Sequence, residues 1–197
     1  MNRETYFQNI ADRLTADELA YVQRAYWLVK EAHRLQIRRL TGERYFEHLR
    51  RVSHMAGFDY NYTDVETITL GLLHDVIEDT FVPATVLLSL FGQNMYQMVL
   101  TLSKEIPTFH PVYGNLEGRV KIAPEVYFEK IKNASHRVRV IKGCDRLDNL
   151  KDIGSWELER RNRFIKETND YVLPIVRETD TRIAEAIESA FLMTAFV

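Results

Sequence analysis

Apolar residues recur at three- and four-residue spacing along most of this 197-residue chain, a period typical of helices that pack through one face. Residues 15–36 show it clearly, with Leu19 and Val22 on the apolar face. Thr15 and Glu18, ahead of them, have the spacing of a capping box. Alternating apolar and polar residues, the pattern of half-buried strands, are scarce. The sequence therefore predicts an all-α fold.

Further helices are expected over 63–80, 83–91, 124–135 and 177–197. Thr63 and Glu66 repeat the capping-box spacing at the start of the first of these. Pro83 is well placed to open the second, and Gly92 to end it. Residues 106–124 differ from the rest because they contain three prolines and two glycines. They predict a long loop or a short hairpin between helices.

The length suits one domain with a sizeable core. We expect a single domain over 1–197, with its core over about residues 20–176 and a C-terminal helix over 177–197. Apolar residues make up 46% and charged residues 27% of the chain, which is typical of a soluble globular protein. No apolar run approaches the roughly 18 residues of a membrane-spanning helix. The charged N-terminal segment also lacks the apolar stretch of a secretory signal.

The charge and the cysteine content narrow the function classes. A formal net charge of −2 gives no overall attraction to nucleic acid or to an anionic membrane, so neither is an expected partner. Cys144 is the single cysteine, which excludes an internal disulfide and a cysteine-rich zinc site. A lone thiol fits a reducing compartment, and we therefore expect a cytoplasmic protein.

The segment GLLHDVIEDT combines an apolar back with titratable side chains. Those side chains are His74, Asp75, Glu78 and Asp79. On a helix they would share one polar side, because residues four apart lie one turn apart. No lysine or arginine within 64–83 balances the carboxylates, and the helix dipole disfavours acids near a C-terminal end by about 0.3–1 kcal/mol. A divalent cation would supply the missing positive charge; a solvated helix face is the alternative.

Two other segments offer ligands of the same kind. His48 shares an apolar, core-directed face with Val52, four residues further on. Asp145 follows Ile141 by four residues, which places a carboxylate among core-facing side chains. Each has a plain alternative: His48 as a histidine whose hydrogen bonds are satisfied within the core, and Asp145 as an aspartate paired with Arg146 or another arginine.

The combined ligand set contains two imidazoles and two carboxylates. Its members are His48, His74, Asp75 and Asp145. Such a set suits Mn²⁺, Fe²⁺, Co²⁺ or Zn²⁺, and no thiolate biases it toward softer metals. Four protein ligands leave positions open on an octahedral ion, which a hydrolytic metal requires.

Five motifs occur in the order GERYFEH, GLLHDVIEDT, TLSKE, RVIKGCDRLDNL and ETNDYVLP. In this order they resemble the hydrolase domain of the RelA/SpoT family, a branch of the HD phosphohydrolase superfamily that includes free-standing small alarmone hydrolases. The resemblance covers about residues 20–176. It implies a mostly helical HD-domain fold with one Mn²⁺ per chain. It also implies a (p)ppGpp 3′-pyrophosphohydrolase of the stringent response, which releases pyrophosphate and GDP or GTP.

The resemblance assigns roles residue by residue. The implied metal ligands are His48, His74, Asp75 and Asp145. The implied water-activating pair is Glu78 and Asp79. The implied substrate-binding residues are Arg39, Asn149, Lys142 and Lys104. Because the chain has no room for a synthetase or regulatory domain, we expect it only to degrade the alarmone.

The sequence departs from the family pattern at several positions near these motifs. They are Leu40, Arg44, Gly143, Cys144 and Asp152. None coincides with an implied metal ligand, but they leave the nucleotide preference open. The alternatives are an HD phosphohydrolase acting on a deoxynucleotide or an adenosine alarmone, and a nucleotide sensor that does not cleave. A third is a nucleic-acid binding module built on HRLQIRR and ELERRNRFIK, although such mixed-charge runs are typical of solvated helix faces.

Overall fold

Helices dominate the chain, as the apolar period predicts. The computed structural model of the protein describes residues 2–38, 41–109 and 116–194. Its first half contains α1 (Arg3–Ala11), α2 (Ala16–Ala32), α3 (Tyr45–His54), α4 (Val65–Leu73), α5 (Val76–Asp79) and α6 (Ala84–Leu102). A hairpin of β1 (Glu105–Phe109) and β2 (Leu116–Lys121) follows. The second half contains α7 (Pro124–Lys132), α8 (His136–Leu150), α9 (Leu158–Glu167), α10 (Leu173–Arg177) and α11 (Thr181–Thr194). Three short helical segments join these helices: η1 (Met55–Asp59), η2 (Ile153–Ser155) and η3 (Thr168–Val172).

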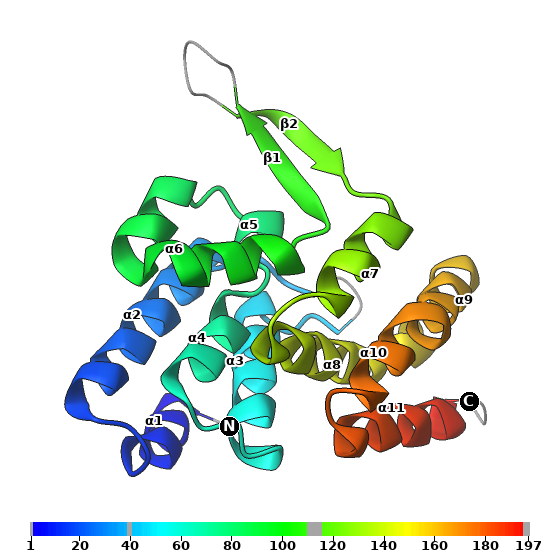
Figure 1. Ribbon diagram of the computed structural model, residues 1–197, viewed down its shortest axis with the longest axis horizontal. Helices are drawn as coiled ribbons and strands as arrows, with labels where there is room; N and C mark the ends of the chain where they lie inside the picture. The colour runs from blue at the N-terminus through cyan, green and yellow to red at the C-terminus, as the bar shows by residue number, and fades with distance from the viewer. Residues whose placement is uncertain (1, 39–40, 110–115, 195–197) are drawn as a thin grey trace.

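The centre of the fold is formed by α4 and α8. α4 is buried from Thr67 to Leu73 and packs against α2, α3, α6 and α8 (Figure 1). α8 crosses the middle of the molecule, with α3 and α4 on one side and α10 and α11 on the other. Since α3, α4 and α8 carry the sequence motifs with His48, His74 and Asp145, the packing of the core brings those motifs together.

Two glycines allow the central helices to approach their neighbours closely. A Cβ on Gly71 of α4 would lie 2.6 Å from the Cα of Ser53 on α3, and a backbone atom cannot move aside easily. A Cβ on Gly143 of α8 would lie 2.9 Å from Cγ2 of Ile183 on α11. Because protein interiors are close-packed, the core depends on the missing side chain at both positions.

The two capping boxes that the sequence predicts have different outcomes. The first is confirmed, since Glu18 and Thr15 exchange hydrogen bonds at the start of α2, with the Thr15 N–H 2.9 Å from Oε2 of Glu18. The second is wrong by one residue, because Asp64 and not Thr63 caps α4. The carboxylate of Asp64 also accepts from Nε of Arg137 at 2.7 Å, an ion pair that a threonine could not form.

The helix predicted over 63–80 is interrupted at His74 and Asp75, which separates α4 from α5. Asp75 has φ −102° and ψ 0°, away from helical values. Nδ1 of His74 donates to the carbonyl of Gly71 at 2.8 Å. In a continuous helix that carbonyl would accept the N–H of residue 75. The prediction of one continuous helix is therefore wrong, and the break falls at the His-Asp pair itself.

The chain after Pro83 also differs from the prediction. α6 begins at the next residue, but Gly92 interrupts the helix instead of ending it, with φ 80° and ψ 173°. A residue with a Cβ would be strained at that φ. The helix then resumes and buries Met95 and Val99 against the core before it ends at Leu102. The predicted stop is a kink within a longer helix.

The proline-rich segment forms the hairpin, which is one of the two outcomes that its composition predicts. β1 and β2 pair in antiparallel fashion, with Pro107 opposite Arg119. β1 packs beside α5, and the hairpin extends away from the helical body in Figure 1. Among the described residues, no helix has the length and apolarity needed to cross a membrane.

Candidate active site and metal centre

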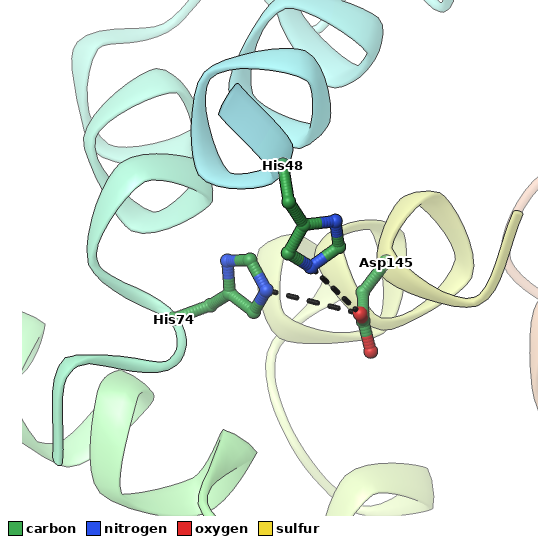
Figure 2. Close-up of side chains that lie close together, drawn as sticks. All are labelled: His48, His74 and Asp145. Carbon is green, nitrogen blue, oxygen red and sulfur yellow. Dashed lines mark ion pairs between the residues drawn. The ribbon is translucent and has the colours of Figure 1, made fainter. Parts of the chain in front are cut away.

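Side chains from α3, α8 and the break between α4 and α5 converge inside the fold. Figure 2 shows the imidazoles of His48 and His74 directed at the carboxylate of Asp145. Oδ1 of Asp145 lies 3.4 Å from Nε2 of His48 and 3.8 Å from Nε2 of His74. Oδ2 of Asp75 lies 3.1 Å from Nε2 of His74 and 3.7 Å from Nε2 of His48. His48, His74 and Asp145 therefore present ligand atoms that all lie within 4.8 Å of one another, and Asp75 lies beside both histidines.

The hydrogen bonds of the two histidines leave one nitrogen of each ring directed at the other ligand atoms. Nδ1 of His74 lies 2.8 Å from the carbonyl of Gly71, and Nδ1 of His48 lies 2.8 Å from Oδ2 of Asp148. Both partners only accept, so Nδ1 carries the proton in each ring. Nε2 of His74 is buried and makes no hydrogen bond of good geometry among the described residues, although Oδ2 of Asp75 lies 3.1 Å away. Such a nitrogen beside two carboxylates fits a divalent cation with nitrogen and oxygen ligands.

The carboxylates make this group of ligand atoms attractive to positive charge. Burial disfavours the imidazolium form of His74, but the charges of Asp75 and Asp145 outweigh it and raise the pKa of His74 to about 9. Burial likewise opposes ionisation of Asp75, yet the neighbouring His74 holds the pKa of Asp75 well below its usual range. In the metal-free protein a proton therefore occupies the place of a cation, and a metal must displace it.

The sequence patterns assign no role to Asp148, which the structure places behind His48. Its carboxylate is fully buried, accepts from His48, and also accepts from Nε and Nη2 of Arg51 at 2.8 and 3.0 Å. Burial disfavours the carboxylate, but these donors outweigh it and hold the pKa of Asp148 well below its usual range. One sequence signal does point to it. Asp148 lies one helical turn beyond Asp145, as Arg51 lies one turn beyond His48, so the two pairs can face each other.

Asp145 is shared between the histidines and a buried lysine. Nζ of Lys142 donates to Oδ2 of Asp145 at 2.7 Å, and Nδ2 of Asn149 donates to Oδ1 at 2.6 Å. The alternative pairing of Asp145 with Arg146 is wrong, because the guanidinium of Arg146 instead lies 4.0 Å from the centre of the Phe164 ring. Burial opposes the charge on Asp145, but Lys142 and the histidines keep its pKa well below the usual range.

Glu78 and Asp79 lie on α5, next to the converging ligands. Oε2 of Glu78 accepts the backbone N–H of Lys104 at 2.7 Å. Loss of surrounding water and the negative charge of Asp75 raise the pKa of Glu78 to about 7 and that of Asp79 to about 6. A bound cation would lower both values through the same electrostatic effect. A carboxyl group that titrates near neutral pH can accept a proton from water, as a general base does.

One cavity of about 410 Å³ opens over these groups. Its lining includes the carboxylates of Asp75, Glu78, Asp79 and Asp145. It also includes the cations Lys104, Lys142, Arg146, Arg160 and Arg163. Two of these cations belong to the run ELERRNRFIK, whose basic residues the sequence alone ascribes to a solvated face or to nucleic-acid binding. Cationic side chains beside a metal-ligand set suit a phosphorylated ligand.

The predicted substrate-binding residues have different outcomes. Arg39 lies outside the described residues, as does Leu40. The other three, Asn149, Lys142 and Lys104, line the cavity of about 410 Å³. Arg38 is hydrogen-bonded to Asn149 and lies 2.9 Å from Oδ2 of Asp152 through Nη1. Arg38 and Asp152 line a second cavity of about 310 Å³. It shares three lining residues with the first cavity: Tyr45, Trp156 and Arg160.

Comparison with known proteins decides the family. A family model described as an HD domain matches residues 25–174. The chain belongs to the HD-domain family. The His-Asp pair of the motif lies at the break between α4 and α5, beside His48 and Asp145. The resemblance that the sequence motifs carry is therefore confirmed at the level of the HD domain.

This HD domain is similar to parts of much longer proteins. The bifunctional (p)ppGpp synthase/hydrolase SpoT of Escherichia coli K12 is 33% identical over 178 residues, which cover 87% of this chain and 24% of the relative. A guanosine-3′,5′-bis(diphosphate) 3′-pyrophosphohydrolase of Aquifex aeolicus is 33% identical over 159 residues, covering 78% of this chain and 21% of the relative. The chain thus spans about a quarter of the length of these curated relatives.

A solved structure is similar over nearly its whole length. It is described as "A metazoan ortholog of SpoT hydrolyzes ppGpp and plays a role in starvation responses", and the superposition has a TM-score of 0.73. The two chains are 22% identical, with 90% of this chain and 97% of the other covered. At this identity the likeness concerns the fold, and it confirms the helical HD-domain arrangement that the sequence predicts.

Proposed function

We propose that this HD domain hydrolyses guanosine tetra- or pentaphosphate at the 3′ position and releases pyrophosphate and GDP or GTP. The observation that carries the proposal is a cavity lined by Asp145 of the histidine and aspartate ligand set, by the carboxyl groups of Glu78 and Asp79, and by five cationic side chains. A ligand with two diphosphates has the charge that such a lining favours. The relatives named as 3′-pyrophosphohydrolases support the same reaction.

Some relatives are named for synthesis of the alarmone and others for its hydrolysis, so the names alone do not indicate which reaction to propose. A GTP pyrophosphokinase of Brucella melitensis is 31% identical over 158 residues. The chemistry of the cavity favours degradation, because the carboxyl groups of Glu78 and Asp79 lie beside the ligand set and line the same cavity as Asp75 and Asp145. A carboxyl group of this kind serves to activate water, which hydrolysis needs.

We propose Mn²⁺ as the cation. Its ligands would be His48, His74, Asp75 and Asp145. Two nitrogen and two oxygen donors without a thiolate suit this ion, and Fe²⁺, Co²⁺ and Zn²⁺ fit the same donors. When bound, such a cation lowers the pKa of a water molecule and neutralises charge on a phosphoryl oxygen.

The residues of the chain supply the remaining chemistry. Glu78, oriented by the N–H of Lys104, takes a proton from the attacking water, and Asp79 helps to hold that water. The water oxygen bonds to the phosphorus attached to the ribose 3′ oxygen. The bond between that phosphorus and the ribose oxygen breaks, the ribose oxygen takes up a proton, and pyrophosphate leaves. Lys142 and the nearby cations stabilise the charge that develops on the phosphoryl oxygens.

The proposed reaction belongs in the cytoplasm. Cys144, the single cysteine of the sequence, is buried as a free thiol, which fits a reducing compartment. The proposed ligand is a small nucleotide, and neither a nucleic acid nor a membrane enters the reaction.

Release of pyrophosphate from ppGpp tests the proposal. The purified chain should release pyrophosphate when Mn²⁺ is added and none in the presence of EDTA. Asp75→Asn should abolish the release, whereas Asp64→Asn, which changes a helix cap outside the cavity, should retain it. Parallel assays with pppGpp, a deoxynucleoside triphosphate and an adenosine alarmone define the substrate. Cleavage of only the deoxynucleotide or the adenosine compound would replace the proposed substrate, and no metal-dependent cleavage of any would refute the activity.

A further inference from the structure

The segment that carries Glu78 and Asp79 is held by a residue from a distant strand. Arg119 on β2 donates from Nη1 to the carbonyl of Ile77 and from Nη2 to the carbonyl of Thr80, each at 2.6 Å. These two carbonyls flank the pair along the chain. We propose that Arg119 is a positioning residue for the two carboxyl groups, acting through the backbone from outside the cavity. The inference rests on the proposed function, in which those groups activate water.

α5 is too short to fix its own end. It has four residues, and the last carbonyls of a helix have no partner within it. Side chains from elsewhere provide the donors. The hydroxyl of Thr80 donates to the carbonyl of Val76, and Nε2 of Gln36 donates to the carbonyl of Asp79 at 2.6 Å. Arg119 alone supplies two such bonds, so it constrains this turn more than either of the other donors.

The guanidinium group is suited to this task. Its N–H groups point in fixed directions within one plane, so bonding two carbonyls at once fixes how those carbonyls lie relative to each other. Its positive charge also lies at the C-terminal end of α5, where the carbonyl dipoles are negative. A lysine would keep the charge but offer a single nitrogen. The conservative change Arg119→Lys therefore separates the effect of the charge from that of the two-point contact.

The base of the hairpin makes a second contact with the same pair, a hydrogen bond to Glu78. The backbone N–H of Lys104, the residue before β1, donates to Oε2 of Glu78 at 2.7 Å. Arg119 lies opposite Pro107, two residue pairs from the end of the hairpin where Glu105 meets its partner. The backbone on both sides of the pair and the Glu78 carboxylate are thus bonded to one structural unit. A displacement of the hairpin base would displace the groups that activate water.

Two variants of Arg119 and a control on the same strand test the proposal. Arg119→Met should lower kcat for ppGpp by at least about tenfold, while KM and the Kd for Mn²⁺ stay within about twofold, because misplacing a reacting group costs rate and not ground-state binding. Arg119→Lys should recover little of the lost kcat. Lys121→Met is the matched control, because Lys121 is 82% exposed and pairs with Glu105 at the surface. It should behave as the wild type does.

Amide hydrogen exchange gives a readout that does not depend on activity. Amides of residues 77–81 should lose protection in Arg119→Met and keep it in Lys121→Met. If the wild type releases no pyrophosphate, the proposed function fails, while the exchange result still tests the role of Arg119. A normal kcat in Arg119→Met, or a loss of Mn²⁺ affinity equal to the loss of kcat, would overturn the proposal. If Arg119→Met does not fold, Arg119→Lys carries the same measurements.

Discussion

Replacing Asp148 with asparagine tests how the fold supports the candidate metal site without changing a proposed ligand. The carboxylate of Asp148 is fully buried and accepts hydrogen bonds from His48 and Arg51. An asparagine of the same shape can still accept the N–H of His48, but its NH₂ group then faces the guanidinium of Arg51. The substitution therefore removes one of the two carboxylate partners of Arg51, leaving Glu43, and weakens the contact that orients the imidazole.

The expected magnitude follows from the burial of this pair. Removing one member of a buried ion pair costs about 3–5 kcal/mol. In a domain of this size 1 kcal/mol shifts Tm by about 2–4 °C, so the metal-free variant should melt about 6–20 °C lower. The side chain of Arg51 is 31% exposed and keeps its ion pair with Glu43, and both facts favour the lower end of that range. Groups that orient a ligating histidine contribute about 10–100-fold in metal affinity, so the Kd for Mn²⁺ should rise by that factor.

Thermal denaturation in EDTA and calorimetric titration with Mn²⁺ measure the two effects of Asp148→Asn. Asp180→Asn is the matched control, because the side chain of Asp180 is also buried, at 5% exposure, and pairs with Arg182 rather than with a histidine. Its Kd for Mn²⁺ should stay within about twofold of the wild type. Wild-type Mn²⁺ affinity in Asp148→Asn would refute the claim that this carboxylate orients His48.

Other features of the site and the core give further predictions. Glu78→Gln should bind Mn²⁺ normally and lose pyrophosphate release by at least about 100-fold; lost affinity with normal turnover per bound ion would make Glu78 a ligand. Because His74 has a pKa of about 9 and must lose its proton to bind metal, and because, against the effect of burial, Asp145 and Asp148 also raise the pKa of His48, Mn²⁺ affinity should fall by at least about tenfold per pH unit as the pH falls below 9. Titrations at pH 6 and 7 measure the slope, and equal affinities would show that both rings are already neutral. Gly71→Ala should cost about 1–3 kcal/mol in a denaturant melt, since its Cβ would lie 2.6 Å from the Cα of Ser53. Gly154→Ala, where a Cβ meets nothing within 4 Å, should cost far less, and equal losses would argue against the close contact.

Local sequence predicts the helices whose ends are set by neighbours in the chain. The capping box of Thr15 and Glu18 and the proline at the start of α7 are both found as predicted. The break between α4 and α5 is not predictable from apolar spacing, because it coincides with a hydrogen bond from the ring of His74 to the carbonyl of Gly71. The apolar residues on either side of the break keep a helical period, so the pattern reads as one helix.

The candidate site likewise has residues that the sequence predicts and supporting contacts that only the structure shows. The motifs that carry the resemblance predict the residues that converge in Figure 2, since each motif marks its own helix. The contacts that support these residues join positions far apart in the sequence, which helical periodicity does not relate. His48 and Asp148 are 100 positions apart, and Ile77 and Arg119 are 42 positions apart. Their roles follow only when the packing of α3 on α8, and of the hairpin on α5, is known.

The central claim is that one cation enables the hydrolysis, held between His48 of α3, His74 at the break between α4 and α5, and the aspartates beside them. Titrating metal-free protein with Mn²⁺ while recording pyrophosphate release from ppGpp tests it most directly. The rate should rise in proportion to added metal and level off at one ion per chain, and His74→Ala should stay inactive over the same range. Full activity of the metal-free protein, or an unchanged titration in His74→Ala, would contradict it.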